Sequence, residues 1–530
     1  MFRVSSRRCS SLAAHLRRSL SRSIHSSVRT NYIDISTRPE IELPYLTGQP
    51  THETRPHYLP MPGYLTPGIS AEEYYERRCV LAARLPPNSV AILVGNTVTF
   101  SSGSVFHDFQ QDNDFYYMTG WLEPNSAAAI VKGATDDDVS LHMFVPAKDP
   151  SVQIWEGERS GLEGAMDFFN ADVAEDISKV GVELQKLVES SEYVFWDDKS
   201  RSKVGNSSAF QSFFSLQSVT RTPKTIQDLV KSSGKTVRSL SSLISEQREV
   251  KSDSEIEVMH AAASISSRGI NKAMATVGSD SPLYTEKALA QYLEYQFVHG
   301  GCDKQAYIPV VASGKNALTI HYTRNDDLLY RDETVFVDAG GKLGGYCADI
   351  SRTWPNSPKG FSEAQRDIYE AVLAVNKKCI ELCHSQLGYS LHDIHERSVK
   401  YIGEELRNLT GFDGLTDSNV ARFLYPHYIG HHLGLDLHDI PGASRFKKLV
   451  PGNVITIEPG VYVPIDEKWP KWYRGIGVRV EDDIVVGSDS VEILNLTSGC
   501  VKEVKDIESL IQAGKVTTPG VYDELVVLDI

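Results

Sequence analysis

The sequence lacks the features that mark a membrane span, a disulfide framework or a nucleophilic hydrolase. No apolar run approaches the roughly 20 residues that cross a bilayer, so no transmembrane segment is expected. The seven cysteines are scattered and form no CxxC pair, which favours free thiols in a reducing compartment over a zinc site or disulfide framework. No G-x-S-x-G elbow and no Cys/His nucleophile signature is present, which argues against a serine or cysteine hydrolase.

The first 33 residues lack lysine and acidic residues but hold seven arginines. They are rich in serine, and Leu12, Leu16, Leu20 and Ile24 recur every four residues along one face of a helix. This pattern is typical of a mitochondrial targeting segment, here residues 1–35, and predicts a location in the matrix or on the matrix side of the inner membrane. The alternative is a basic tail that binds nucleic acid or lipid, although such tails usually include lysine.

Acidic residues outnumber basic residues in the rest of the chain. The whole sequence has 54 Lys and Arg against 69 Asp and Glu, a net charge of −15. Without the seven N-terminal arginines the balance is 47 against 69, a net charge of −22. A body this acidic argues against nucleic-acid binding.

The length and the apolar pattern predict two folded domains between terminal extensions. Residues 36–66 are rich in Pro and Tyr and predict an extended arm, and residues 511–530 are expected to form a tail. In residues 67–248 helices alternate with short apolar strands, which indicates an α/β domain. Residues 249–510 open with a capping-box pattern (SDSE), and their alternating strands favour antiparallel pairing.

Four acidic residues end apolar segments of the second domain. They are Asp338 (TVFVDAGG), Asp349 (YCADISRT), Glu458 (VITIEPGVY) and Glu481 (GIGVRVEDD). Asp338 and Asp349 are eleven residues apart, so two antiparallel strands could place both carboxylates at one site. Carboxylates held this close repel one another unless cations neutralise them, so the cluster predicts two bridged divalent cations and a two-metal hydrolase. For the two aspartates the alternative is a solvated turn.

A histidine-rich segment, PHYIGHHLGLDLHD, would supply a nitrogen ligand. Its four histidines are His427, His431, His432 and His438. These residues alone do not decide between His431 and His432 as the ligand. His321, in ALTIHYTRND, is a fifth candidate and is expected in a strand that lines the cleft.

The segment GVRVED combines a candidate ligand with charged neighbours. In a strand, Arg479 and Glu481 share one face, so the arginine could orient the ligand carboxylate. Asp482 and Asp483 are expected to be solvated turn acids.

The order of these segments resembles the pita-bread (creatinase-fold) metallopeptidases, specifically aminopeptidase P. The quoted segments HY…VDAGG…ADISRTWP…GHHLGLDLHD…TIEPGVY…GIGVRVEDD carry the resemblance over residues 252–510. The segments DNDFYYMTGWLEPNSAAAIV and IWEGERSG resemble the N-terminal domain of aminopeptidase P and prolidase. The resemblance therefore implies an α/β domain of that type followed by an α+β pita-bread catalytic domain with an antiparallel sheet.

The resemblance also implies a ligand set. The family's metal histidine lies four residues after one active-site histidine and seven before another, which matches His431 between His427 and His438. One cation would be held by Asp338, Asp349 and Glu481, and the other by Asp349, His431, Glu458 and Glu481. Manganese is the expected metal, and a hydroxide held between the two cations would attack the peptide carbonyl.

The resemblance assigns roles to the remaining residues. Glu458 would shuttle the proton of the nucleophilic water, while His427 and His438 stabilise the oxyanion and hold the substrate carbonyl. His321 would bind on the leaving side of the scissile bond, and Arg479 would support Glu481. A homodimer or homotetramer is expected, as is common among relatives.

The predicted function is removal of a single N-terminal residue from peptides or imported mitochondrial proteins, of the intermediate-cleaving or Xaa-Pro type. The proposed substrate is a matrix precursor with a bulky N-terminal residue. A prolidase-type Xaa-Pro dipeptidase would share all five ligands, so the metal site does not separate the two. A non-catalytic pita-bread binding module is a further alternative, against which the intact ligand set argues.

Overall fold

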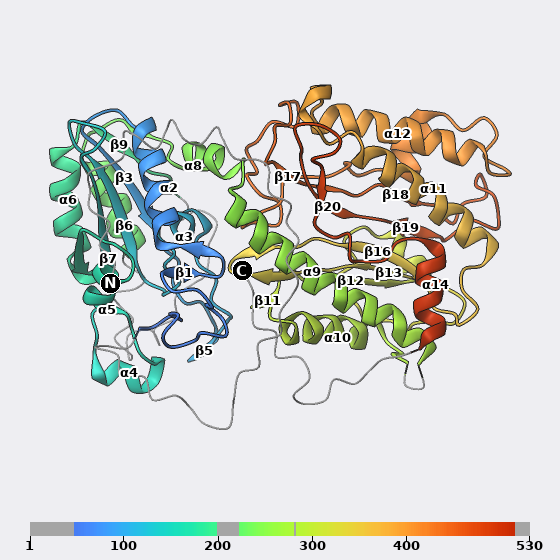
Figure 1. The fold of residues 1–530 in the computed structure, drawn as a ribbon, viewed down its shortest axis with the longest axis horizontal. Helices are drawn as coiled ribbons and strands as arrows, with labels where there is room; N and C mark the ends of the chain where they lie inside the picture. Colours follow the sequence, from blue (N-terminus) through green and yellow to red (C-terminus); the bar gives the residue numbers. More distant parts are fainter. Residues whose placement is uncertain (1–46, 199–221, 280–281, 515–530) are drawn as a thin grey trace. The chain divides into compact units, whose positions relative to one another are not determined.

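The computed structural model describes residues 47–198, 222–279 and 282–514, which form two compact units (Figure 1). Unit 1 ends at Gln247 and unit 2 begins at Arg248, whereas the sequence predicted the border between residues 248 and 249. The predicted leader, residues 1–35, lies outside the described residues. None of the helices in the described ranges is both long and apolar enough to span a membrane.

The predicted arm and tail differ from the structure where it describes them. Residues 47–63 form turns rather than an extended arm, and β1 (Tyr64–Thr66) pairs with β2 (Ile69–Ser70). Gln49 and Leu59 are buried, so this segment packs as part of unit 1. At the other end, α14 (Val504–Ala513) extends into the predicted tail, because the apolar face that includes Ile511 is buried.

A six-stranded mixed sheet forms the centre of unit 1, in the order β10-β9-β3-β6-β7-β8. Its strands are β3 (Ser89–Val94), β6 (Ala127–Lys132), β7 (Val139–Val145), β8 (Val173–Asp176), β9 (Tyr193–Phe195) and β10 (Val237–Arg238). The pairs β3–β6 and β6–β7 are antiparallel, whereas β9 and β8 join β3 and β7 in parallel. The apolar runs of residues 67–248 therefore include the central strands β3, β6 and β7. A short hairpin, β4 (Phe100–Ser102) and β5 (Val105–Phe106), lies outside this sheet.

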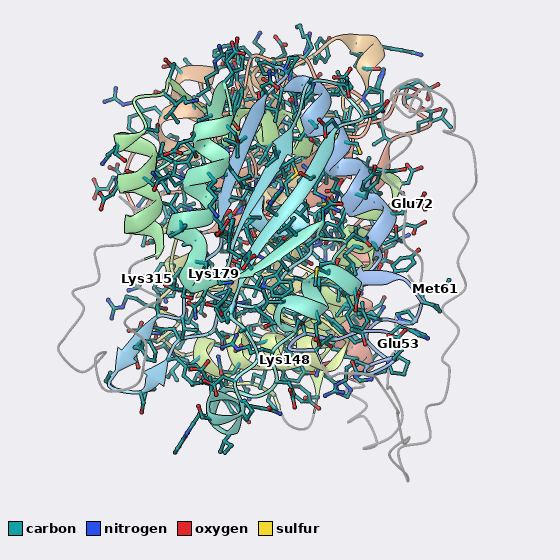
Figure 2. All side chains as sticks on the ribbon, turned by 90° about the vertical axis from the view of Figure 1, so that its left-hand side faces the viewer. Glu53, Met61, Glu72, Lys148, Lys179 and Lys315 are labelled. Atoms are coloured by element: carbon teal, nitrogen blue, oxygen red, sulfur yellow. The ribbon has the colours of Figure 1, made fainter. Side chains whose placement is uncertain are left out.

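Helices accompany this sheet, as the alternating pattern predicts. They are α2 (Ala71–Arg84), α3 (Asn113–Thr119), α4 (Pro150–Glu156), α5 (Gly161–Asp167), α6 (Val180–Ser190), α7 (Thr222–Ser232) and α8 (Ser241–Arg248). The α2 helix begins after Ser70, whose side chain accepts the Glu73 N–H and so caps the helix. Figure 2 looks onto the strands of this unit, with Glu72 marking α2 at one side. Apolar residues of α6 and α7 pack with those of β3 and β6 to form the core.

Unit 2 holds small antiparallel sheets enclosed by long helices. Its strands are β11 (Lys304–Gln305), β12 (Val310–Ser313), β13 (Thr334–Asp338), β14 (Gly341–Leu343), β15 (Tyr346–Cys347), β16 (Ser351–Pro355), β17 (Val454–Ile457), β18 (Gly460–Tyr462), β19 (Gly477–Arg479), β20 (Asp482–Val485) and β21 (Leu494–Asn495). They form the groups β12-β13-β16, β11-β14-β15, β17-β20-β21 and β18-β19. Every pair among these strands is antiparallel, as the alternating pattern predicts.

Four long helices enclose these strands: α9 (Asp253–Ala275), α10 (Glu286–His299), α11 (Glu363–Ile380) and α12 (Leu391–Arg407). Ser252 and Glu255 form the predicted capping box at the start of α9. The helices pack as the pairs α9–α10 and α11–α12, with β13 and β16 drawn between them in Figure 1. The helical face of α9 that includes Met259 and Ile270 is buried.

The turn after β13 brings distant carboxylates together. Asp338, the last residue of β13, pairs with Ser351, the first residue of β16. Between them the chain makes the β14–β15 hairpin and returns to Asp349. A side-chain carbon on Gly340 would lie 1.9 Å from the Ala348 carbonyl oxygen, so this close return requires glycine.

Candidate active site

The five predicted metal ligands lie together at the ends of the unit 2 strands. Asp338 ends β13, Asp349 precedes β16, Glu458 follows β17 and Glu481 lies between β19 and β20. The segment that contains His431 runs beside β17. The Thr456 N–H donates to the His431 carbonyl at 2.9 Å, and the His431 N–H donates to Thr456 Oγ1 at 3.1 Å.

Asp349, His431 and Glu481 form the tightest group. Each offers one ligand atom, and these atoms lie within 4.8 Å of one another. His431 Nε2 is 3.4 Å from Asp349 Oδ2 and 3.8 Å from Glu458 Oε1. Such spacing, with oxygen atoms in the majority, suits hard divalent cations.

The hydrogen bonding of His431 leaves one nitrogen facing the carboxylates. Its Nδ1 donates to the His432 carbonyl at 3.0 Å, so Nε2 is the nitrogen that could bind a cation after losing its proton. A ligand histidine is usually oriented by such a bond to a backbone carbonyl. His432 is partly buried, and burial, assisted by the charge of Lys251, lowers its pKa to about 4.

The electrostatics of the group fit bound cations. Burial, opposed by Arg479, raises the pKa of Asp338 to about 6. Burial also raises the pKa of Glu458 to about 7, while burial and repulsion from Asp349 raise that of Glu481 far above its usual range. Despite burial, the hydrogen bond to His431 lowers the pKa of Asp349. The protein's own cations therefore leave buried negative charge uncompensated, which divalent cations would neutralise.

Arg479 contacts Asp338 directly and reaches Glu481 through a serine. Its Nη2 donates to the Asp338 carboxylate, and its Nε donates to Ser351 Oγ at 3.0 Å. Ser351 Oγ in turn donates to Glu481 Oε2 at 2.6 Å. The arginine thus orients two candidate ligands, where the sequence suggested only Glu481.

His427 belongs to a chain of hydrogen bonds that starts at Arg479. Arg479 Nη1 donates to the Tyr462 hydroxyl at 2.9 Å, which lies 2.9 Å from His427 Nε2. His427 Nδ1 is 2.8 Å from the Tyr428 carbonyl and so carries the proton. Burial and Arg479 lower the pKa of His427 to about 3, which keeps the ring neutral. In this arrangement His427 retains no N–H for a substrate oxygen, unlike the role that the family resemblance implied.

The other two predicted histidines lie at the edge of the group. The ring of His438 is 4.4 Å from that of His431, and the residue is exposed. His321 lies in a turn after η5 (Gly314–Leu318) and is exposed, so its predicted strand is wrong. Burial, assisted by the charge of His431, lowers the pKa of His438.

Asp482 and Asp483 are buried, which corrects their prediction as solvated turn acids. They begin β20, which lies between β17 and β21, so neither side chain reaches solvent. Asp482 accepts hydrogen bonds from Arg352 Nη2 at 2.9 Å and Lys502 Nζ at 2.6 Å. Asp483 Oδ2 accepts the Asp349 N–H at 3.1 Å and so fixes the backbone of a candidate ligand.

The sequence did not single out Tyr307, Ser351 or Tyr462. The Tyr307 hydroxyl lies 2.5 Å from Asp338 Oδ1 and 2.5 Å from Asp349 Oδ1. No sequence motif predicts this contact, because the position of Tyr307 depends on the turn between β11 and β12. Ser351 could have been found, since it lies two residues after Asp349, the period of a strand.

Replacing Tyr307 with phenylalanine is expected to lower kcat/KM or the affinity for metal by roughly 10–100-fold. The change removes the hydroxyl that joins Asp338 and Asp349 and keeps the ring. Activity and metal content should be measured together. Tyr284→Phe, at an exposed position, is the matched control and should change neither. Wild-type activity and metal affinity in Tyr307→Phe would contradict the prediction.

Removal of metal is expected to destabilise the fold increasingly as pH rises. A carboxyl group with a raised folded pKa stabilises the fold below its unfolded pKa, and loses that contribution as pH rises through the folded value. This applies to Glu458 between 4.5 and about 7. His431, whose pKa rises to about 9, acts in the same direction between 6.5 and 9. The difference in Tm between metal-loaded and chelator-treated protein should therefore widen from about pH 5 to about pH 8. A constant difference would contradict this.

Two family models match the chain. The model "Metallopeptidase family M24" matches residues 257–488, and "Aminopeptidase P, N-terminal domain" matches residues 74–196. The chain is 49% identical to Intermediate cleaving peptidase 55 of Saccharomyces cerevisiae, over 89% of this chain and 90% of that protein. It is 36% identical to human Xaa-Pro aminopeptidase 3, over 89% of this chain and 92% of the relative.

Solved structures show the same similarity. Icp55 from Saccharomyces cerevisiae, with 58 N-terminal residues deleted, matches with a TM-score of 0.75 and 47% identity, covering 86% of this chain and 100% of that chain. Icp55 bound to the inhibitor apstatin gives a TM-score of 0.72 at 46% identity, covering 84% and 99%. Aminopeptidase P from Escherichia coli with the inhibitor Pro-Leu gives 0.74 at 29% identity, again covering 84% and 99%.

Proposed function

The chain belongs to metallopeptidase family M24, with an aminopeptidase P N-terminal domain before a pita-bread catalytic domain, and from this we propose its substrate, metal and compartment. It is a metallo-aminopeptidase that removes N-terminal residues and uses divalent metal ions. The proposed substrates are imported proteins, from which it removes a single residue. The observation that carries this proposal is the 49% identity to Intermediate cleaving peptidase 55 over almost the whole chain.

The protein is mitochondrial, like its relative in Arabidopsis thaliana, the "Intermediate cleaving peptidase 55, mitochondrial". We propose the matrix, or the matrix side of the inner membrane, as its location. The arginine-rich, acid-free first 33 residues support this finer assignment.

We propose that two manganese ions occupy the site. Asp338, Asp349 and Glu481 would hold one, and Asp349, His431, Glu458 and Glu481 the other. Oxygen atoms make up most of this set, which suits manganese. Bound there, the cations would lower the pKa of a coordinated water and polarise the scissile carbonyl.

The chain's own residues orient the substrate and move the proton. Glu458 follows β17 and accepts the Thr456 hydroxyl at 3.3 Å, which directs Oε1 toward His431. We propose that Glu458 takes the proton of the attacking water and returns it to the leaving amine. His438 would donate to the substrate carbonyl oxygen. His427 holds the Tyr462 hydroxyl in place. His321 would contact the substrate on the leaving side of the scissile bond.

A peptide-library digest with added manganese tests the proposed function. The expected result is release of one residue per chain from peptides longer than two residues, with bulky first residues preferred. Cleavage restricted to Xaa-Pro dipeptides would instead indicate a prolidase-type enzyme. Inactivity of the metal-loaded protein toward every peptide would overturn the proposal.

The cellular substrate calls for a separate experiment. Protein N-termini should be compared between mitochondria with and without this gene product, and those lacking it should keep one extra residue on a set of imported proteins. Unchanged N-termini would overturn the proposed substrate class. The proposed homodimer or homotetramer is tested by light scattering of the purified protein.

A further inference from the structure

A buried ionic cluster lies at the end of the loop that contains His438. We define the His438 loop as residues 432–440. Its residue Asp439 is only 4% exposed. Arg248 Nη2 is 2.5 Å from Asp439 Oδ1, and Lys251 Nζ is 3.0 Å from Oδ2. Both cationic side chains are themselves buried, at 7% and 1% exposure. One carboxylate therefore pairs with two buried cations, of which Arg248 also pairs with Asp436, so its loss would remove an ion pair from both.

The backbone of Asp439 shares an anchor with the candidate metal ligand His431. The Asp439 N–H donates to the His432 carbonyl at 2.9 Å, and His431 Nδ1 lies 3.0 Å from the same oxygen. The His432 carbonyl therefore joins the end of the His438 loop to its start and also orients the His431 ring. The ring of His438 accordingly lies edge-on to that of His431, at 4.4 Å.

The loop is held in an unfavourable backbone conformation beside this anchor. Ile440 has a φ of +45° and is buried. A β-branched residue rarely adopts the left-handed region, so the surrounding contacts must impose it. Gly434 completes the fit, because a side-chain carbon there would lie 2.6 Å from Asp439 Oδ2. The loop is thus shaped around the Asp439 carboxylate.

We propose that Asp439 is a positioning residue, which uses its ion pairs with Arg248 and Lys251 to direct His438 toward the substrate carbonyl. This inference rests on the proposed role of His438. Metal binding should not depend on the Asp439 carboxylate, since Thr456 holds the His431 backbone through two hydrogen bonds and the His432 carbonyl holds its ring. Loss of Asp439 should therefore slow the chemical step without releasing metal.

A double-mutant cycle tests the proposal on the full, manganese-loaded protein. Asp439→Asn should lower kcat by roughly 10–100-fold, change KM less than about twofold and leave the metal content unchanged. In a His438→Ala background, which alone should lower kcat by about 100-fold or more, Asp439→Asn should add less than about twofold. Asp436→Asn is the matched control, because Asp436 also pairs with Arg248, at 2.6 Å, but is 44% exposed. It should change kcat less than about twofold.

The outcomes separate this inference from the role on which it rests. Wild-type kcat in His438→Ala would overturn the role of His438 itself. A large loss in that variant together with an unchanged Asp439→Asn enzyme would overturn only the positioning role. Independent, multiplicative losses, or loss of metal from Asp439→Asn, would show a merely structural role. If Asp439→Asn does not fold, Lys251→Gln replaces it in the same cycle, since it removes one ion pair and keeps the other.

Discussion

Asp349→Ala is expected to abolish peptide hydrolysis and metal binding together. Asp349 lies beside His431 Nε2, accepts the Tyr307 hydroxyl and would ligate both cations. Residues that only orient a ligand typically contribute about 10–100-fold, so loss of a shared ligand should lower kcat/KM by more than about 1000-fold. The variant should also lose the pH-dependent stabilisation by metal.

Metal content and activity of Asp349→Ala should be measured on the same preparation. Asp413→Ala, at an exposed aspartate, is the control for removing one negative charge from this acidic protein. Two bound metal ions and measurable turnover in Asp349→Ala would show that the ligand set is assigned incorrectly. An inactive variant that keeps its circular-dichroism spectrum would exclude global unfolding as the cause.

Glu458→Gln is expected to lower kcat by roughly 100–10,000-fold, the usual contribution of a general acid–base residue. The amide keeps the shape of the side chain but cannot take a proton from the attacking water. Substrate binding should persist, so KM should change much less than kcat. Isothermal titration with a slowly cleaved peptide would measure binding independently of turnover.

Glu467→Gln is the matched control for this change, because Glu467 is exposed. It should behave as the wild type in both kcat and KM. A Glu458→Gln enzyme with near-normal kcat would assign proton transfer to another group. Equal losses of binding and turnover would indicate that Glu458 acts mainly as a ligand.

Much of the candidate site could be predicted because its residues end strands of period two. Asp338, Asp349, Glu458 and Glu481 each follow or interrupt an apolar alternating run, and such runs fold into the antiparallel pairs observed. The family resemblance added the choice of His431 over His432 as the nitrogen ligand. In the structure the His431 ring faces the Asp349 carboxylate.

The remaining contacts depend on packing that local patterns do not contain. Tyr307 contacts the carboxylates of Asp338 and Asp349 only because the turn before β12 places it beside the end of β13. Asp482 and Asp483 follow a strand in the sequence and so suggest a turn, yet β20 runs between two other strands. Arg352, which is distant in sequence, makes the burial of Asp482 possible. His321 follows an apolar run that forms η5 instead of a strand.

The wide separation of the ligands along the chain has a consequence for the protein's own folding. Asp338 and Glu481 are 143 residues apart, and the strands next to the five side chains belong to separate small sheets. A site assembled from such non-local contacts forms late, because loop closure precedes the contacts that stabilise it. A chain in which these contacts have not formed would lack the complete candidate site, so we expect peptidase activity to appear only after the catalytic unit has folded.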